Sequence, residues 1–565
     1  SYPLIRVMEI LLDRLWKRLY DRVDILRADE LLKEAPGKGL VYLPNHRSHI
    51  DYLLLSYFIY QQGLAPPHIA AGANLNFPVI GPILRRGGAF FLRRSFKGEP
   101  LYAATFREYM HTMITRGFPI AYFIEGGRSR SGRTLSPKGG LLGMTLESFM
   151  RDHARPLLLA PVYIGYEKLL EGRTLIAELE GQPKKRESLW ALIGTVRSLR
   201  REYGNAYMSF GEPLSLEGFL DTAAPEWRTL PEDARRDAAR RLTAPLAREM
   251  TERINAAVVV NPINLFAMAI VASPRHALDE RALVHQIIWL RTIAERLPYS
   301  AQATLTAESP PAAVESALKL GFGVRVPNPL GDVIKVPDDQ VPTLNYIRNN
   351  VLHVYALPAL VGSLLLGMRE ATRDSVAAFC EDMQPFMHAE LMLHYSPDEA
   401  GEAARRIVDL FVEIGWAQEA GGTVRAADRS SAEHSGLELL ARSLRHLLRR
   451  DYLTMALLTS IGSGKIKRGR LEELMQMLTQ RLSLLSEFAP PDFYERSTFS
   501  AYFDTLLETG VVREDEDGWL HVDLRIRVSQ RNIERLLPAD AVLAIRRITT
   551  DQAAIAGSGE PAERG

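Results

Sequence analysis

The sequence predicts an α/β domain with a mostly parallel sheet flanked by helices, followed by a mainly α-helical C-terminal domain. Short apolar runs alternate with amphipathic stretches over the first 230 residues, and such runs nearly disappear afterwards. Strands that alternate with helices favour parallel pairing, because each helix returns the chain to the same edge of the sheet. With 565 residues the chain is also too long for one ordinary domain.

The alternation can be followed along the first part of the chain. Residues 4–23 place apolar side chains at helical spacing beside basic ones, which predicts an amphipathic helix within residues 1–30. An α/β domain is then expected over residues 31–230. Its predicted strands are 39–44, 87–93, 119–125, 156–166 and 206–214, and its predicted helices are 49–61, 99–115, 137–152 and 188–202.

Long amphipathic stretches dominate the second part of the chain, which predicts a mainly helical domain over residues 231–550. The residues from 551 to 565 are small and polar, so we expect a disordered tail there. The predicted helices are 233–257, 277–296, 310–319, 374–394, 400–415, 433–449, 469–486 and 497–509.

The charge of the chain and its distribution indicate which kinds of ligand or partner it could bind. The formal net charge is +1, so nothing global points to nucleic acid. Between Arg85 and Lys138, however, eleven Lys/Arg stand against three Asp/Glu, a local charge of +8. Such a field favours an anionic ligand or an anionic surface, although a solvated basic face remains the alternative. The single cysteine, Cys380, excludes an internal disulfide and is expected to be simply buried.

The two most apolar stretches of the chain are 254–273 and 351–368. The first contains Pro262 and several asparagines, and the second contains His353 and Pro358. Neither is a run of 18 strongly apolar residues, so we expect buried helices rather than membrane spans. Contact with a membrane would then occur at its surface.

The segment PNHRSHIDYLLL offers a histidine and a carboxylate for acid–base chemistry. His46 and Asp51 are five residues apart, which on a regular helix places them about 140° apart. They can meet only if His46 lies in the turn and Asp51 in the first helical turn, as a capping box from Ser48 to Asp51 would allow. A base oriented by a carboxylate could activate a hydroxyl. The alternatives are a loop histidine and a helix cap, and His49 is a rival base.

Two segments rich in glycine and arginine could bind phosphate: RRGGAFFLRRSFKG (85–98) and FIEGGRSRSGRTLSPKGG (123–140). Glycines let the backbone approach an anion, and arginines fork onto phosphate oxygens. The alternative is a surface loop with solvated arginines. Other catalytic templates are missing from the sequence, including the G-x-S-x-G elbow, a complete P-loop and metal-ligand spacings of Cys and His.

Taken in order, these segments resemble the four sequence blocks of the glycerolipid acyltransferase superfamily. The blocks are His46-x4-Asp51, GGAFFLRR (87–94), FIEGGRSRSG (123–132), and Pro161 within APVYIGY. Flanking sequence is similar to the bacterial membrane-associated glycerol-3-phosphate 1-O-acyltransferases. That similarity continues through NPINLFAMAIVAS (261–273) and YIRNNVLHVYALPAL (346–360).

The resemblance implies a role for each matching residue. His46 would be the general base, oriented by Asp51, and the acceptor hydroxyl would attack a thioester directly, without a covalent enzyme intermediate or a cofactor. Arg94 and Arg128 would hold the phosphate. The remaining substrate-binding residues implied are Glu125, Gly126, Gly127 and Ser129, which would shape the site, Pro161 in its wall, and Arg93 and Arg130 as lesser contributors.

The resemblance also implies substrates and a location. The acceptor would be glycerol 3-phosphate, and the donor acyl-CoA or acyl carrier protein bearing an acyl chain. The product would be 1-acyl-sn-glycerol 3-phosphate, the first intermediate of phospholipid synthesis. We expect a peripheral or monotopic protein on the phospholipid surface of the bacterial inner membrane, at its cytoplasmic face. A 1-acylglycerol-3-phosphate acyltransferase is an alternative, although Gly127 stands where that family usually has threonine; an inactive membrane scaffold is another.

Overall fold

A computed structural model describes residues 2–73, 76, 78, 80–93, 98–172, 203–485 and 496–557, which form two compact units. The first unit contains Ser1–Pro262 and Tyr299–Ala307, and the second contains Ile263–Pro298 and Glu308–Gly565. The division therefore falls later than residue 230, where the sequence predicted the change from α/β to helical structure.

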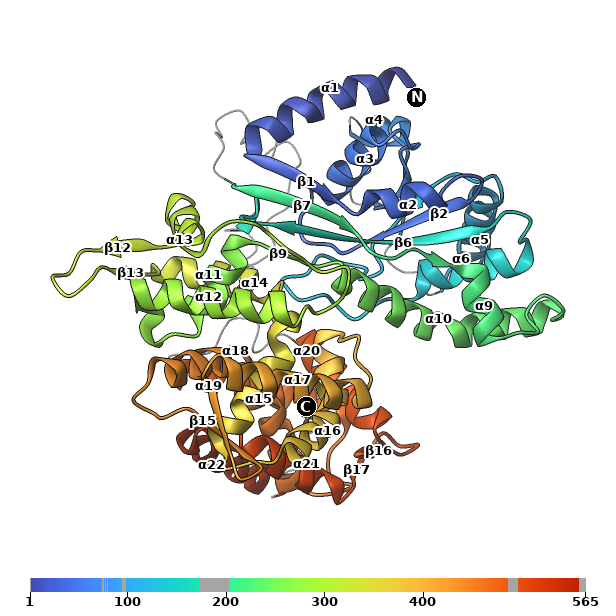
Figure 1. The fold of residues 1–565 in the computed structure, drawn as a ribbon. Coiled ribbons are helices and arrows are strands. Elements are labelled where there is room, and N and C mark those ends of the chain that lie inside the picture. Colours follow the sequence, from blue (N-terminus) through green and yellow to red (C-terminus); the bar gives the residue numbers. More distant parts are fainter. Residues whose placement is uncertain are drawn as a thin grey trace. The chain divides into compact units, whose positions relative to one another are not determined.

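Among the described residues of the first unit, eight strands form a central sheet (Figure 1). Its strand order is β1-β7-β6-β2-β5-β3-β4, with β8 paired to β6. Strand β6 pairs antiparallel with β7 and β8, and the other pairs are parallel, which confirms the mostly parallel sheet. The strands are β1 (Arg22–Leu26), β2 (Gly39–Pro44), β3 (His68–Gly72), β4 (Ala89–Leu92), β5 (Ile120–Ala121), β6 (Leu157–Tyr166), β7 (Asn205–Phe210) and β8 (Leu214–Ser215).

Helices cover both faces of this sheet. Figure 1 shows α1 and α3 on one face and α6, α9 and α10 on the other. A short parallel pair, β9 (Val259–Val260) and β11 (Thr304–Leu305), completes the unit. The helices are α1 (Tyr2–Leu19), α2 (Ala28–Glu34), α3 (Asp51–Gln61), α4 (Ile80–Arg86), α5 (Pro100–Thr115), α6 (Gly140–Arg151), α9 (Leu216–Ala223) and α10 (Glu232–Ala256).

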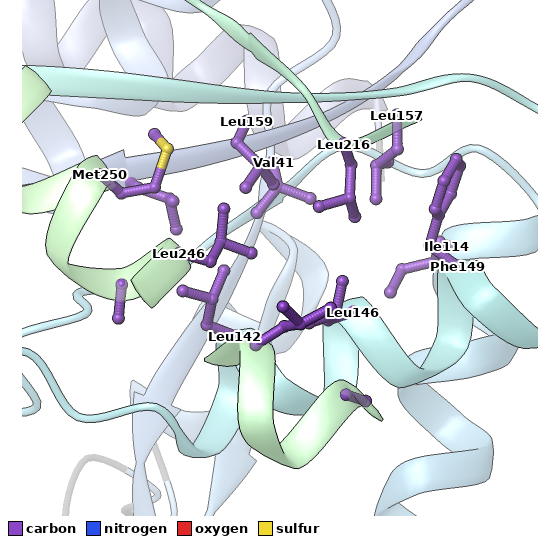
Figure 2. Close-up of a cluster of buried hydrophobic side chains, with 14 of the residues drawn as sticks. Val41, Ile114, Leu142, Leu146, Phe149, Leu157, Leu159, Leu216, Leu246 and Met250 are labelled. Atoms are coloured by element: carbon purple, nitrogen blue, oxygen red, sulfur yellow. The ribbon is translucent and has the colours of Figure 1, made fainter. Parts of the chain in front are cut away.

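The helix α10 explains the later boundary. Its side chains Leu246 and Met250 are fully buried and face Leu142 of α6 and the strand residues Val41 and Leu159 (Figure 2). Burial of such a side chain contributes about 1.5–3 kcal/mol. The sequence shows that α10 is amphipathic, but it does not show which partner covers the apolar face. A boundary predicted at residue 230 therefore places this helix in the helical domain.

Several short elements of the first unit were not predicted. The helix expected over 4–23 ends at Leu19, because β1 begins at Arg22. Strand β3 and helices α2 and α4 are too short to show a clear period. The strand expected over 119–125 is reduced to β5, and the residues that follow it enter the turn described below. The predicted helix 188–202 lies outside the described residues.

Helices dominate the second unit, as predicted. Helix α15 is buried along most of its length and packs against α18. The helices are α11 (Pro262–Val271), α12 (Glu280–Arg296), α13 (Pro310–Lys319), α14 (Val341–Asn349), α15 (Leu352–Gly367), α16 (Arg373–Leu391), α17 (Pro397–Glu413), α18 (Ala432–Ile461), α19 (Arg468–Leu485), α20 (Arg496–Glu508), α21 (Arg525–Glu534) and α22 (Ala539–Gly557).

Short antiparallel strands decorate these helices. Strands β10, β13 and β12 form a three-stranded sheet, and β14–β15 and β16–β17 are hairpins. Two helices of 3₁₀ type, Pro274–His276 and Asp338–Gln340, lie between longer elements. The strands are β10 (Ala277–Asp279), β12 (Val324–Val326), β13 (Val333–Lys335), β14 (Ala417–Ala420), β15 (Thr423–Ala426), β16 (Val512–Glu514) and β17 (Leu520–Val522).

The two apolar stretches were expected to be buried helices, and the residues from 551 onward were expected to be disordered. The stretch 351–368 is the buried helix α15, whereas 254–273 is divided between α10, β9 and α11. Within the described residues no single helix could cross a membrane; one pair, Asp338–Asn349 with Leu352–Gly367, has sufficient length and composition only together and is bent by 91°. The tail expected to be disordered from residue 551 instead continues α22 to Gly557, and residues 558–565 are not described. Cys380 is buried, as expected.

Candidate active site

The site is built on a turn, residues 45–50, which we call the His46 turn. It connects the end of β2 to the start of α3. Asn45 fixes the turn to the neighbouring strand β6: its side-chain amide donates to the carbonyl of Ile164 at 3.1 Å, and its Oδ1 accepts from the Ile164 N–H at 2.7 Å. The turn therefore leaves the sheet between β5 and β6, at the carboxyl end of a parallel strand, where α/β folds place their ligands.

His46 and Asp51 meet in the geometry that the sequence required. His46 lies in the turn and Asp51 is the first residue of α3, and 2.9 Å separates Nδ1 of His46 from Oδ2 of Asp51. The Asp51 side chain is fully buried, whereas 15% of the His46 side chain is exposed. A buried carboxylate that holds a partly accessible imidazole is the arrangement of a general base and its orienting acid.

The other partners of Asp51 determine the role of each imidazole nitrogen. Oδ2 also accepts the backbone N–H groups of Arg47 at 2.7 Å and Ser48 at 2.9 Å, and Oδ1 accepts the hydroxyl of Tyr166 at 2.7 Å. Such donors stabilise the ionised carboxylate, which can only accept. Nδ1 of His46 is therefore the donor, which leaves Nε2 to accept a proton. Burial, followed by the charge of Asp51, raises the pKa of Tyr166.

The loop that follows β5 packs directly on His46. The ring of Phe123 stacks on the imidazole with 3.9 Å between ring centroids and 15° between planes. The N–H of His46 donates to Oε1 of Glu125 at 2.9 Å, and the N–H of Ser129 donates to the His46 carbonyl at 3.0 Å. The rival base His49 lies beside this ring, with centroids 6.4 Å apart. Because Asp51 binds the imidazole of His46, the geometry favours His46 as the base.

Glu125 is a buried carboxylate that holds the backbone on both sides of the site. It is buried, and its second oxygen accepts the N–H of Leu135 at 3.1 Å. Burial raises the pKa of this carboxyl group, and the charge of Arg47 and the N–H donors of His46 and Leu135 oppose that rise. Both carboxylate oxygens are thus used to hold backbone, so Glu125 acts as a support for the His46 turn.

The glycine and serine positions of the loop play different roles. Gly126 has φ +64°, and a Cβ atom there would lie 2.6 Å from Cδ of Lys138, so a side chain is disfavoured. At Gly127 a Cβ atom would meet nothing within 4 Å, so this backbone is open to a ligand. Ser129 is buried; its hydroxyl donates to the Arg133 carbonyl at 2.6 Å and accepts the Gly132 N–H at 3.1 Å.

Of the arginine and proline residues predicted for the site, those that the structure describes lie in three different parts of the first unit. Arg128 and Arg130 are half-buried in the loop beside His46. Arg93 is more than half exposed after β4, forms an ion pair with Glu99, and lies 4.9 Å from the centroid of the Tyr102 ring. Pro161 is buried in β6 opposite Leu43 of β2, so its position is inside the sheet. Arg94 lies outside the described residues.

Sequence reasoning missed Arg47, Tyr166 and Glu171. Arg47 is buried and donates to the Arg133 carbonyl at 2.8 Å and to Oγ1 of Thr134 at 3.3 Å, which ties the His46 turn to the loop after β5. Its position within the His46 segment was the only available signal. Tyr166 is at the end of a predicted strand, and nothing in the sequence relates its hydroxyl to Asp51.

Comparisons with known proteins identify the family. A family model described as the glycerol-3-phosphate acyltransferase C-terminal region matches residues 176–515, and one described as acyltransferase matches residues 26–165. A protein of Pseudomonas paraeruginosa (strain PA7) named glycerol-3-phosphate acyltransferase is 41% identical over 563 residues, covering 99% of this chain and 68% of that protein. The chain belongs to the glycerol-3-phosphate acyltransferase family. The acyltransferase match contains the His46 turn and the loop after β5.

Other relatives agree with this membership in the glycerol-3-phosphate acyltransferase family. The protein of the same name from Pseudomonas entomophila (strain L48) is 39% identical over 551 residues, covering 97% of this chain and 66% of that protein. A crystal structure of the 1-acyl-sn-glycerophosphate (LPA) acyltransferase from Thermotoga maritima covers 42% of this chain and 80% of its own, at 21% identity and a TM-score of 0.25. Membership confirms the family resemblance stated from the sequence blocks.

Proposed function

We propose that this chain transfers a fatty acyl group from a thioester donor to the sn-1 hydroxyl of glycerol 3-phosphate, giving 1-acyl-sn-glycerol 3-phosphate. The observation that carries the proposal is the 2.9 Å contact between Nδ1 of His46 and Oδ2 of Asp51 in a member of the glycerol-3-phosphate acyltransferase family. This contact provides an oriented base for a hydroxyl nucleophile. In the proposed reaction the acceptor hydroxyl attacks the thioester directly, without an enzyme nucleophile or a cofactor.

The reaction follows from the roles of the two imidazole nitrogens. Nε2 of His46 accepts the proton of the acceptor hydroxyl while the hydroxyl oxygen bonds to the thioester carbonyl carbon. Asp51 stabilises the imidazolium through Nδ1–H. When the tetrahedral intermediate collapses, the C–S bond breaks, and the proton on Nε2 passes to the departing sulfur. The base is restored, and the products are the ester and the free thiol.

The phosphate of the acceptor is proposed to bind at the loop after β5. Arg128 and Arg130 belong to the same loop as Phe123 and Glu125, which contact His46. Guanidinium groups bind phosphate in a bidentate manner, and the open backbone at Gly127 allows close approach. Arg94 remains part of this proposal on the sequence blocks alone. For Arg128→Ala we expect the KM for glycerol 3-phosphate to rise more than the KM for the acyl donor; equal changes would contradict a phosphate role.

The donor and the location are also proposals. Acyl-CoA and acyl carrier protein are both anionic, which suits the charge of +8 between Arg85 and Lys138. Helix α1 leaves Val7, Ile10 and Leu11 about half exposed beside basic side chains, as expected of a helix lying on an anionic phospholipid surface. We therefore propose a peripheral or monotopic protein, attached through apolar side chains, on the cytoplasmic face of the bacterial inner membrane. Release from membranes by salt alone, without detergent, would contradict apolar attachment.

The decisive experiment is a thioester assay with His46→Ala and His49→Ala as a matched pair. Free thiol release is followed with either glycerol 3-phosphate or its 1-acyl product as acceptor. We expect transfer to glycerol 3-phosphate in the parent and in His49→Ala, and its loss in His46→Ala, with circular dichroism showing that all three proteins are folded. Near-parental turnover in His46→Ala would refute His46 as the general base. A preference for the 1-acyl product would instead assign the second acylation step.

A further inference from the structure

We propose that Glu171 is a positioning residue that holds the His46 turn in its active conformation. The inference rests on the proposed function and adds to it a residue that the sequence blocks do not contain. Glu171 lies just after β6 and is buried. The residues that it contacts are Ser48 and His49, which occupy the turn between the base and its orienting acid.

The contacts of Glu171 are short and specific. The hydroxyl of Ser48 lies 2.9 Å from Oε1 and 2.8 Å from Oε2, so it can donate to either oxygen. The backbone N–H of His49 donates to Oε1 at 2.6 Å. Ser48 is fully buried, so water cannot easily replace this acceptor. The expected capping box is thus only half formed: Asp51 accepts the Ser48 N–H, but the Ser48 hydroxyl binds Glu171.

Together, three carboxylates bind four consecutive backbone N–H groups of the turn. Glu125 accepts from His46, Asp51 accepts from Arg47 and Ser48, and Glu171 accepts from His49. The N–H groups that precede a helix have no partner within the helix and must find one outside it. Loss of Glu171 would deprive the buried Ser48 hydroxyl and the His49 N–H of their acceptor next to Asp51. We expect the turn to rearrange in response and to shift the carboxylate that orients His46.

The surrounding phenols show that the two carboxylates share one environment. Burial raises the pKa of Tyr52 to about 12, and the charges of Glu171 and Asp51 add to the rise. The same three causes, in the same order, raise the pKa of the buried Tyr20. Glu171 and Asp51 thus lie close to the same two tyrosines.

The test compares Glu171→Ala with Glu167→Ala in the full chain. Glu167 is a matched control because it is also buried and lies four residues earlier, after the same strand. Its oxygens accept from the N–H of Asn205 at 2.8 Å, from the Asn205 side-chain amide at 3.0 Å and from the Tyr207 hydroxyl at 2.8 Å, so it supports β7 rather than the His46 turn. Both variants should lower the Tm, and only Glu171→Ala should lower kcat.

We expect a fall in kcat of about 10²-fold for Glu171→Ala, the size that a misplacement of about 1 Å produces, with little change in either KM. Glu171→Gln should recover most of this loss, because its amide oxygen can still accept the His49 N–H. If Glu171 acts through the His46–Asp51 pair, adding Glu171→Ala to Asp51→Asn should cause little further loss, since residues that act as a unit are not additive.

Several results would overturn the inference. They are parental kcat in folded Glu171→Ala, a change confined to KM, or losses that add fully to those of Asp51→Asn. If Glu171→Ala does not fold, Ser48→Ala replaces it, because that variant removes the hydroxyl that Glu171 binds, and parental kcat in it would have the same meaning. Failure of the proposed function is distinguishable, because it requires an active His46→Ala, whereas an inactive His46→Ala beside a fully active Glu171→Ala refutes the role of Glu171 alone.

Discussion

Asp51→Asn is the substitution whose effect the structure predicts most closely. Oδ2 of Asp51 accepts two backbone N–H groups, at 2.7 and 2.9 Å, in addition to the imidazole. An amide nitrogen at that position would oppose those donors, so the asparagine should place its oxygen there and its nitrogen toward the Tyr166 hydroxyl, which can also accept. The His46 tautomer is then preserved, and only the charge is lost.

The size of the loss follows from that charge. With about 4 Å between the imidazolium and carboxylate charge centres and an effective dielectric constant of about 20, Coulomb's law gives about 4 kcal/mol. A barrier raised by this amount lowers kcat by about 10³-fold. An amide that inverts the tautomer of a catalytic histidine costs about 10⁴-fold. We therefore expect the smaller of these two losses in Asp51→Asn.

The assay is thiol release at saturating glycerol 3-phosphate and donor, with the Tm measured in parallel. Glu167→Gln serves as the control, because it neutralises another buried carboxylate that binds β7 and not the turn. We expect its kcat to stay near that of the parent. A loss below about tenfold in Asp51→Asn would refute the electrostatic role, because about 1.4 kcal/mol is far less than the charge should contribute. An effect on KM alone would refute it equally.

Three further substitutions test separate parts of the structure. Tyr166→Phe removes the 2.7 Å bond to Asp51 and should lower the free energy of unfolding by about 1.5–3 kcal/mol, measured in urea, with a smaller loss of kcat than in Asp51→Asn. Gly126→Ala, at φ +64° and 2.6 Å from Lys138 Cδ, should cost about 1–2 kcal/mol and raise the KM for glycerol 3-phosphate; unchanged values would remove the argument from backbone conformation. Burial raises the pKa of Glu252 from 4.5 to about 7, so its contribution to stability is lost as pH rises through that window. Glu252→Gln should match the parent near pH 4 and melt higher at pH 8, and equal Tm values at both would contradict the shift.

The features that depend on local periodicity were predictable from the sequence. The helices α12, α13 and α20 begin and end within a few residues of the predicted bounds, because an amphipathic stretch carries its own period. Strand β6 was equally clear as a continuous apolar run. The pairing of His46 with Asp51 was predictable as a condition on the turn, but the capping box that suggested it is only half formed, and α3 begins at Asp51 itself.

The features that depend on tertiary contact were not predictable in the same way. Ser48 and Glu171 are 123 residues apart, and neither has a pattern that indicates the other. The boundary at Pro262 depends on which surface covers α10, and an amphipathic helix gives no information on its partner. The substrate roles of Arg93 and Pro161 stay predictions from the sequence blocks: Arg93 pairs with Glu99 at the surface, and Pro161 is buried within the sheet.

The carboxylates around the His46 turn also bear on which hydroxyl of the acceptor reacts. The start of a helix ordinarily attracts phosphate, but in the turn just before α3 the N–H groups of Arg47, Ser48 and His49 already bind Asp51 and Glu171. A phosphate there would meet negative charge, whereas Arg128 and Arg130 offer the opposite sign in the adjacent loop. Glycerol 3-phosphate would thus bind in one orientation. Its phosphate would lie away from the histidine, and the terminal hydroxyl at its other end would lie at Nε2 of His46. Selectivity for the primary over the secondary alcohol would then arise from repulsion at one end as much as from attraction at the other.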